Sequence, residues 1–327
     1  MTDESDAKPA AQVELDAQVK PGAQVKPAAK HKKSNALLNV MIAISAIAMI
    51  GALGLIAYPT FSDWWNRMHQ SYAVAGYVEQ TKDMSGAERK AMLKAAHEYN
   101  ERLAANGDRW HMTDAQKREY DETLDVTGTG IMGYVTIPRI KVKLPVYHGT
   151  SDGVLQIAAG HLAGTSLPVG GATTHAVVSG HTGLPSARML TGLDELQKGD
   201  TFAFHVLDET YTYQVDQISV VLPSEISKLN IESGTDYATL ITCTPYGVNS
   251  HRLLVRGHRI PNPKVPDKTQ YDEPGEMTAV AAAVIGLLVF VAGCAFVGLA
   301  RLWRRSWIVR HGLCAGAGAR HSSGVRG

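Results

Sequence analysis

The residues with the clearest chemical potential stand around a single cysteine. Cys243 ends a β-type run, and His251 and Arg252 open the next one, after a Pro- and Gly-containing segment at 244–250 that is typical of a loop. If the two runs pair antiparallel, Cys243 and Arg252 lie opposite each other. A guanidinium beside a thiol favours the thiolate and offers donors to the oxyanion that forms when the thiolate attacks a carbonyl. This spacing predicts a nucleophile, Cys243, with Arg252 as its partner.

A histidine follows a third β-type run in the segment Ser-Gly-His-Thr-Gly-Leu-Pro. His181 lies just past residues 175–179, and the glycines around it allow a turn and close approach by a substrate backbone. Histidine is the usual side chain for giving or taking a proton near neutral pH. A lone histidine in a turn is commonly a surface residue, so it is the presence of Cys243 that marks His181 as its proton-transfer partner.

Two uncharged apolar runs, 36–58 and 277–300, each exceed the roughly 20 residues that a membrane-spanning helix needs. Basic residues flank both runs on their outer sides: Lys26, Lys30, Lys32 and Lys33 before the first, and Arg301, Arg304, Arg305 and Arg310 after the second. The positive-inside rule then places both termini in the cytoplasm and the region between the runs outside. We therefore expect a multi-pass protein of the cell membrane. A cleaved signal peptide is the alternative for the first run, although its apolar core is longer than usual.

Cysteine usage supports a reactive role for Cys243. Cys294 falls within the second apolar run and Cys314 in the C-terminal tail, so Cys243 is alone in the expected external region. A lone thiol in an oxidising compartment favours intermolecular pairing or a reactive role.

Composition excludes other classes of function. Lys and Arg total 32 and Asp and Glu total 31, which gives none of the basic excess expected of a nucleic-acid binder. Histidines are frequent, but no HExxH, paired CxxC or His-x-His spacing occurs among those at 148, 161, 175, 205, 251 and 258. We expect neither a metal site nor a cofactor.

The rest of the chain divides into regions by composition. Residues 1–35 form a low-complexity segment, expected to be a disordered cytoplasmic tail. Region 59–129 is helical: Ser85 with Glu88 and Thr113 with Gln116 match capping boxes, and residues 106–112 join the two predicted helices.

From residue 130 to 260 the chain carries short β-type runs separated by Gly, Pro and Asp. They occupy residues 132–137, 144–147, 175–179, 201–206, 211–221, 237–243 and 252–259. Many short strands without long helices between them predict a mainly β domain, as a closed barrel or, less readily, a sandwich. Residues 261–276 are expected to be a linker and 301–327 a cytoplasmic tail.

Several of these segments resemble one protein family. Thr-Leu-Ile-Thr-Cys at 239–243 matches the TLxTC signature of sortases, and 243–252 is similar to the class C, pilin-polymerising branch of Gram-positive bacteria. Gly-His-Thr-Gly-Leu-Pro-Ser at 180–186, Gly133-Tyr134 before Ile137-Pro138, and Tyr-His-Gly-Thr at 147–150 also resemble that branch. The resemblance covers roughly residues 75–260, and two flanking membrane helices are common in that branch.

The resemblance implies an eight-stranded sortase-type β-barrel and a two-step acyl transfer. Cys243 would attack the Thr carbonyl of an LPxTG-like sorting signal, His181 would protonate the leaving amine, and Arg252 would hold the substrate and stabilise the oxyanion. The thioester would then pass to a lysine amine of the next pilin. Thr242 and His161 are candidates for the substrate groove. The expected partners are pilins or surface proteins with such signals, with an amine from a pilin lysine or a cell-wall peptide as acceptor.

Class C enzymes usually carry an N-terminal lid with an Asp-Pro-aromatic motif. This chain has Asp108-Arg109-Trp110, which keeps the acid and the aromatic but lacks the proline. As a lid, the segment would bring Asp108 near Arg252 and Trp110 over Cys243. As an ordinary connection between helices, it would do neither.

Other functions remain to be separated from this one. A sortase that attaches proteins to cell-wall peptide differs only in its acceptor, and the segment Pro-Tyr-Gly-Val-Asn at 245–249 favours the pilin branch. A Cys-His-Asn protease could use Asn249, but that leaves Arg252 without a task. A non-catalytic membrane-tethered assembly or surface protein is the third alternative. No LPxTG-like motif precedes the second apolar run, which argues against a surface protein.

Overall fold

Eight strands form the closed barrel that the sequence predicts. The computed structural model describes residues 36–264, 269, 271 and 279–312, so the predicted tail 1–35 and parts of the linker and the C-terminal tail lie outside the described residues. Around the barrel the order is β1-β2-β3-β4-β7-β8-β6-β5. The strands are β1 (Ile131–Ile137), β2 (Val142–His148), β3 (Ala159–His161), β4 (Thr174–Ser179), β5 (Thr201–Val206), β6 (Glu209–Val221), β7 (Asp236–Thr244) and β8 (His251–Arg259).

Alternation of side chains along the strands builds the barrel core. In β5, Phe202, Phe204 and Val206 are buried while the residues between them are half-buried. The rings of Phe202 and Phe204 form a T-shaped pair with centroids 6.0 Å apart, and both contact the ring of Tyr213 in β6. Such pairs contribute about 0.5–1.5 kcal/mol beyond the area they bury. They bring the β5–β6 hairpin together from within.

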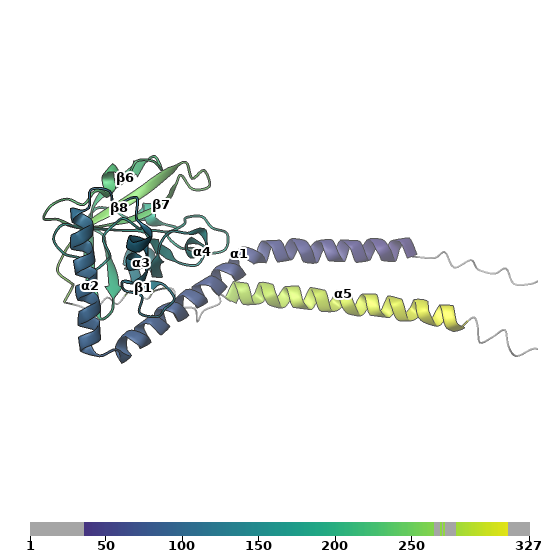
Figure 1. The fold of residues 1–327 in the computed structure, drawn as a ribbon. Coiled ribbons are helices and arrows are strands. Elements are labelled where there is room, and N and C mark those ends of the chain that lie inside the picture. Colours follow the sequence, from purple (N-terminus) through teal and green to yellow (C-terminus); the bar gives the residue numbers. More distant parts are fainter. Residues whose placement is uncertain (1–35, 265–268, 270, 272–278, 313–327) are drawn as a thin grey trace, which may run out of the picture.

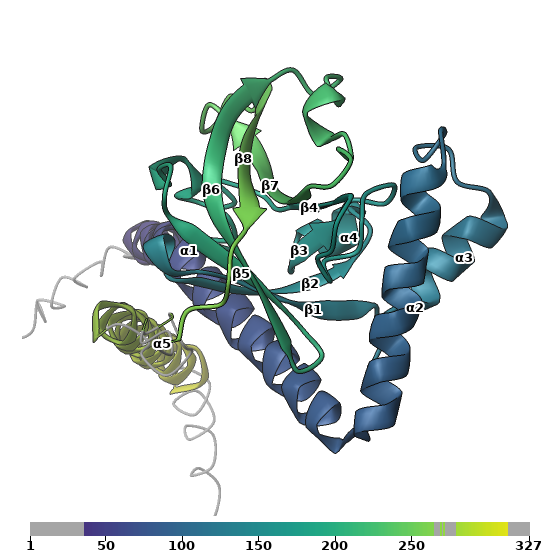
Figure 2. The same ribbon diagram turned by 90° about the vertical axis from the view of Figure 1, so that its left-hand side faces the viewer.

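Helices lie beside the barrel or project away from it, as Figures 1 and 2 show. The long ones are α1 (Ala36–Asp83), α2 (Gly86–Ala105), α3 (Asp114–Glu122) and α5 (Ala279–Gly312), and the short ones are α4 (Asp152–Leu155), η1 (Pro138–Ile140), η2 (Leu193–Glu195) and η3 (Ser227–Leu229). Both predicted capping boxes are present, at Ser85 for α2 and at Thr113 for α3. Each box satisfies backbone donors that a helix start leaves open.

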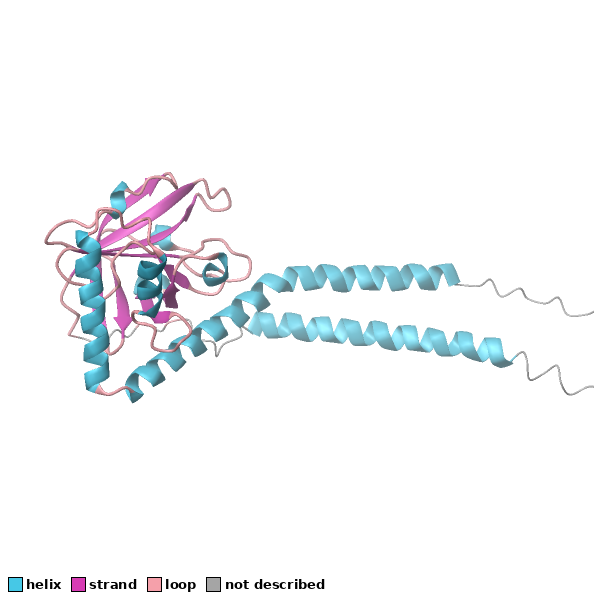
Figure 3. Cartoon of the chain, viewed as in Figure 1, coloured by secondary structure: helices cyan, strands magenta, loops and turns pink. Residues whose placement is uncertain are grey.

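The helix α1 continues well beyond the apolar run that predicts it. Its apolar first part projects from the barrel and its second part packs along β1 and β2 (Figures 1 and 3). The helix changes direction as it reaches the barrel, and Pro59 lies inside it, which is the residue type that bends helices.

One helix in the described part of the chain, Leu37–Asp83, is long and apolar enough to cross a membrane. In α5 the corresponding apolar stretch is shorter, Ile285–Gly298. The helices α1 and α5 contact each other and run side by side away from the barrel (Figure 3). The second membrane helix therefore stays a prediction.

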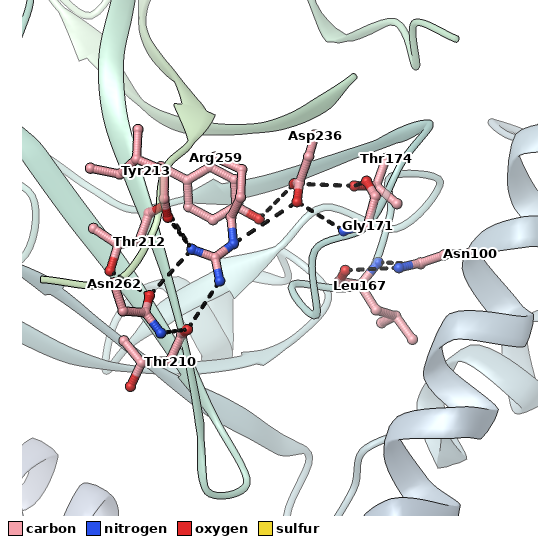
Figure 4. A network of polar contacts seen from close by, with 11 residues as sticks. Asn100, Leu167, Gly171, Thr174, Thr210, Thr212, Tyr213, Asp236, Arg259 and Asn262 are labelled. Atoms are coloured by element: carbon pink, nitrogen blue, oxygen red, sulfur yellow. Dashed lines mark hydrogen bonds and ion pairs between the residues drawn. The ribbon is translucent and has the colours of Figure 1, made fainter. Parts of the chain in front are cut away.

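A polar network closes the end of the barrel where β4 and β7 begin and β8 ends. Asp236 accepts hydrogen bonds from Tyr213 (2.9 Å), Gly171 N–H (2.9 Å) and Thr174 (3.3 Å), and its carboxylate lies 4.0 Å from Arg259 (Figure 4). Nearby, the Asn100 side chain of α2 exchanges two hydrogen bonds with the Leu167 backbone (3.1 and 2.7 Å). Cys243 lies at the opposite end of β7, away from these contacts.

Candidate active site

Three neighbouring strands bring the predicted site residues together at one end of the barrel. In β7 and β8, which are antiparallel, Cys243 is paired with Arg252. In β4 and β7, which are parallel, Ser179 is paired with Ile241, and Gly180 N–H donates to the Ile241 carbonyl at 3.0 Å. His181 follows directly, so all three residues lie at adjacent strand ends.

The faces of the strands decide where these side chains point. Leu240 and Leu253 belong to the barrel core, whereas Ile241 and Leu254 belong to a second apolar cluster on the other face of the same strands. Because side chains alternate along a strand, Cys243 shares the face of Ile241, and Arg252 shares the face of Leu254. Cys243 is a free, half-buried thiol on this outer face.

The Arg252 guanidinium is only partly occupied. Its Nη1 donates to the carbonyl of Asn249 (3.2 Å) in the loop between β7 and β8 and to that of His251 (3.1 Å) at the start of β8. Arginine carries five N–H donors, and within the described residues only Nη1 is bonded. The donors on Nε and Nη2 are therefore available for an anion that forms beside Cys243.

The His181 loop, defined here as residues 180–192, touches the loop that follows Cys243. A Cβ on Gly183 would come within 2.8 Å of the Tyr246 ring, and Gly183 has φ +72°, so glycine is needed there both for space and for backbone conformation. The His181 carbonyl accepts a hydrogen bond from Leu190 N–H at 3.0 Å, which closes the loop on itself.

The Asp108-Arg109-Trp110 segment lies on the same outer face. Trp110 packs against the second apolar cluster, which consists of Val177, Val221, Leu229, Ile241 and Leu254. Asp108 is exposed and pairs with His111 (2.8 Å), so its partner is not Arg252, whose bonds among the described residues go to Asn249 and His251.

Arg109, to which the sequence assigned no role, is the buried member of this segment. Its Nη1 donates to the Gly164 carbonyl (2.8 Å), and its Nη2 donates to the Leu229 carbonyl (3.0 Å) and to Asn230 Oδ1 (3.3 Å). The guanidinium also lies 4.3 Å from the centre of the Trp110 ring. Burial lowers the pKa of Arg109. Its side chain thus joins the segment to two loops at once, and local sequence offers no signal for such long-range contacts.

The two predicted groove residues are both buried. His161 is fully buried, with Nε2 2.8 Å from the Ser166 carbonyl and Nδ1 3.0 Å from the Tyr120 hydroxyl, and burial lowers its pKa to about 3. Thr242 is 3% exposed, on the core face of β7. Neither side chain faces an open groove, because both belong to inward-facing positions of their strands.

Two further expectations concern Asn249 and metal ions. Asn249 has φ +59° in the loop, and its carbonyl accepts from Arg252, as suits a turn residue. In residues 36–264, 269, 271 and 279–312 no group of His, Cys, Asp and Glu side chains is placed to hold a metal ion.

The chemistry available at this end of the barrel is that of a thiol, an imidazole and a guanidinium. These features define a class of protein: a closed β-barrel with a cysteine, a histidine and an arginine at three adjacent strand ends.

Known proteins resemble this chain. The Sortase domain model matches residues 135–260. Sortase A of Streptococcus agalactiae serotype III (strain NEM316) is 30% identical over 117 residues, which are 35% of this chain and 47% of that protein. Sortase A of Bacillus anthracis is 26% identical over 149 residues, 44% of this chain and 69% of that protein. The chain thus spans about half the length of the first of these curated relatives.

Solved structures extend the similarity. Sortase C1 from Streptococcus agalactiae is 50% identical with a TM-score of 0.58, and the match covers 59% of this chain and all of that one, 100%. Sortase C of Clostridium perfringens, solved with the C-terminal cell wall sorting motif, is 39% identical with a TM-score of 0.52 and coverage of 59% and 100%. The chain belongs to the sortase family of transpeptidases, and to class C within it.

Proposed function

We propose that this chain is a membrane-anchored cysteine transpeptidase that polymerises pilins outside the cytoplasmic membrane. The observation that carries the proposal is the pairing of Cys243 with Arg252 across β7 and β8, with His181 at the adjacent end of β4. The 50% identity to a sortase C1 over that whole structure supports the pilin branch.

In the first step the Cys243 thiolate attacks the Thr carbonyl of an LPxTG-like sorting signal. The new C–S bond forms, the C–N bond to the following residue breaks, and His181 gives its proton to the leaving amine. The sorting motif bound in the structure of the Clostridium perfringens sortase C supports a substrate of this chemistry.

In the second step an amine of a pilin lysine attacks the thioester carbonyl. A C–N bond replaces the C–S bond, the proton of the amine returns to His181, and Cys243 leaves as the thiolate. The product is an isopeptide bond between two pilins. No oxidant or reductant takes part, because both steps are acyl transfers.

Arg252 stabilises the oxyanion in both steps through its Nε and Nη2 donors. A positioned donor of this kind contributes about 3–4 kcal/mol to the transition state. The bonds from Nη1 to the Asn249 and His251 carbonyls hold the guanidinium toward Cys243 before substrate arrives.

Residues 108–110 act as a lid on this site. Trp110 covers the apolar cluster beside Cys243, and Arg109 rather than a proline-fixed backbone holds the segment closed. Because Asp108 pairs with exposed His111, the acidic residue contributes little to closure.

The test is incubation of the full chain, in lipid nanodiscs, with a pilin that carries its sorting signal. Denaturing gels and mass spectrometry would show ladders with Lys-to-Thr isopeptide bonds for wild type and none for Cys243→Ala. Cys294→Ala, which changes an exposed thiol of α5, is the matched control and should behave as wild type. Cleavage without ladders would favour a sortase that uses a cell-wall peptide as acceptor. Equal products from Cys243→Ala would refute the cysteine mechanism, and no product from wild type would favour a non-catalytic role.

A further inference from the structure

The part of α1 just after its apolar run contacts the His181 loop through three polar side chains. Asp63, Asn66 and Gln70 are spaced three and four residues apart, so they lie on one face of the helix. We call these three residues the polar face of α1. Asp63 and Asn66 are separated in sequence by 125 and 120 residues from the loop residues Arg188 and Ser186 that they contact.

Asp63 and Asn66 form hydrogen bonds to the backbone of the loop. Asp63 Oδ1 accepts from Arg188 N–H at 2.7 Å, and Asn66 Nδ2 donates to the Ser186 carbonyl at 2.8 Å. Arg67 forms an ion pair with the other oxygen of Asp63 at 3.0 Å, which fixes the orientation of the carboxylate. Two neighbouring positions of the loop backbone are thereby tied to one helix.

Gln70 extends the contact into the interior. Its side chain is 6% exposed, and Nε2 lies 2.9 Å from the Ile157 carbonyl and 3.2 Å from Met189 Sδ. A buried amide that loses its partners costs about 1–3 kcal/mol, so these bonds are maintained in the folded chain. Met189 is itself buried and precedes the residue that bonds to His181.

A short path connects these contacts to His181. Arg188 and Met189 are held by α1, and the next residue, Leu190, donates its N–H to the His181 carbonyl at 3.0 Å. A Cβ on Gly180 would meet Leu190 at 2.8 Å, so Leu190 packs directly against the backbone beside His181. On its other side the loop meets Tyr246 of the loop after Cys243.

We propose that the polar face of α1 positions His181 for proton transfer. Asp63, Asn66 and Gln70 are positioning residues, since they act on His181 through residues 186–190 and not on the substrate. This inference rests on the proposed function of His181. In this proposal α1 contributes to catalysis as well as to anchoring.

The experiment uses the full chain in nanodiscs and compares Asp63→Ala with Asp63→Asn. The Asn variant keeps an oxygen acceptor for Arg188 N–H, whereas the Ala variant removes it. Asn66→Asp places a carboxylate against the Ser186 carbonyl, and Tyr72→Ala, which changes an exposed residue of α1, is the matched control. Transpeptidation is measured as separate kcat and KM values, and amide hydrogen exchange is followed over residues 186–191.

We expect Asp63→Ala and Asn66→Asp to lower kcat by about three- to tenfold with KM unchanged, because a lost hydrogen bond shifts the loop toward conformations in which His181 is misplaced. Exchange at 186–191 should rise in the same variants. Asp63→Asn should restore at least half of the wild-type kcat, and Tyr72→Ala should match wild type.

Wild-type kcat in Asp63→Ala and Asn66→Asp despite faster exchange would overturn the positioning role, as would an equal loss of kcat in Tyr72→Ala. A fall in kcat that Asp63→Asn does not restore would also overturn it. Failure of the proposed function would look different, because wild type itself would then form no isopeptide product, or His181→Ala would turn over normally.

Discussion

Replacing Arg109 with alanine should open the proposed lid and expose Cys243 to bulky reagents. The side chain donates three hydrogen bonds, to Gly164, Leu229 and Asn230, and it is 9% exposed. A hydrogen bond from a charged group contributes about 1.5–3 kcal/mol to stability. Desolvation of the guanidinium, which lowers its pKa, opposes these gains, so we assign about 1.5–3 kcal/mol to the whole set.

That free energy converts to a change in the open population of about ten- to a hundredfold, at about 1.4 kcal/mol for each factor of ten. The assay is the rate of Cys243 alkylation by a bulky maleimide, in a Cys294→Ala/Cys314→Ala background that leaves one thiol. Arg109→Ala should react about ten- to a hundredfold faster than the parent, because reaction through a rare open state scales with its population. Arg109→Lys should fall between them, since an ammonium cannot reach both loops with a planar fork.

The matched control is Arg102→Ala, which removes an exposed arginine of α2 that pairs with Glu119. Its alkylation rate should equal that of the parent. If Arg109→Ala reacts at the parent rate while Trp110→Ala reacts faster, the lid closes through its aromatic ring and the argument from Arg109 fails. If neither change has an effect, residues 108–110 do not cover Cys243.

Three further predictions concern stability, measured by urea unfolding of the full chain in detergent. Thr242→Val should be neutral or stabilising by up to about 1 kcal/mol, because the buried hydroxyl has no hydrogen-bond partner in the described residues; a loss above 1 kcal/mol would reveal a hidden bond. Gly180→Ala should cost about 1–3 kcal/mol through overlap with the Leu190 side chain, and an unchanged midpoint would contradict that contact. Burial lowers the pKa of His161 to about 3 and of His175 to about 4, so the unfolded chain takes up protons first as pH falls below the ordinary value of 6.5. The free energy of unfolding should therefore decline from pH 6.5 toward pH 4, and the decline should be less steep in His175→Gln. Asp236 acts in the opposite direction, because burial raises its pKa. Equal slopes in wild type and variant would contradict the assignment.

Local patterns predicted most of the secondary structure. The β5 run was predicted at residues 201–206, which are its observed bounds, and both capping boxes lie where Ser85 and Thr113 indicate them. These features depend on neighbours within a few residues, so a single sequence contains the information. The ends of β7 and β8 could be predicted for the same reason, and with them the pairing of Cys243 with Arg252.

Features that depend on distant contacts were not predictable. The strand β3 has three residues and is defined by its parallel pairing with β2 and its antiparallel pairing with β4, and residues 159–161 carry no alternating pattern of their own. The run 36–58 predicted the apolar first part of α1, but the single helix continues to Asp83, where Tyr77 bonds to Met132 and Leu207 of the barrel region.

The structure shows which of the predicted site residues are buried and which are accessible, a difference that the sequence alone did not reveal. His161 and Thr242 were predicted as candidates for the substrate groove, yet the parity of their strand positions turns both inward. Arg109 offered no motif at all, since its three acceptors come from loops about 55 and 120 residues away. Reactive residues at a strand end can be recognised in a single sequence, whereas the segments that pack over that end depend on contacts made only in the folded chain.

The position of the polar face along α1 sets how membrane tilt acts on the site. Asp63 and Gln70 follow the last apolar residue of the first run, Tyr58, by about 8 and 18 Å at 1.5 Å per residue. For a helix that leans by about 20° in a bilayer, points this close to the membrane surface shift sideways by only about 3–6 Å, while Asp83 at the far end shifts by about 13 Å. Tilting of the anchor therefore displaces the residues of α1 that contact the His181 loop less than it displaces the far end of the helix at Asp83.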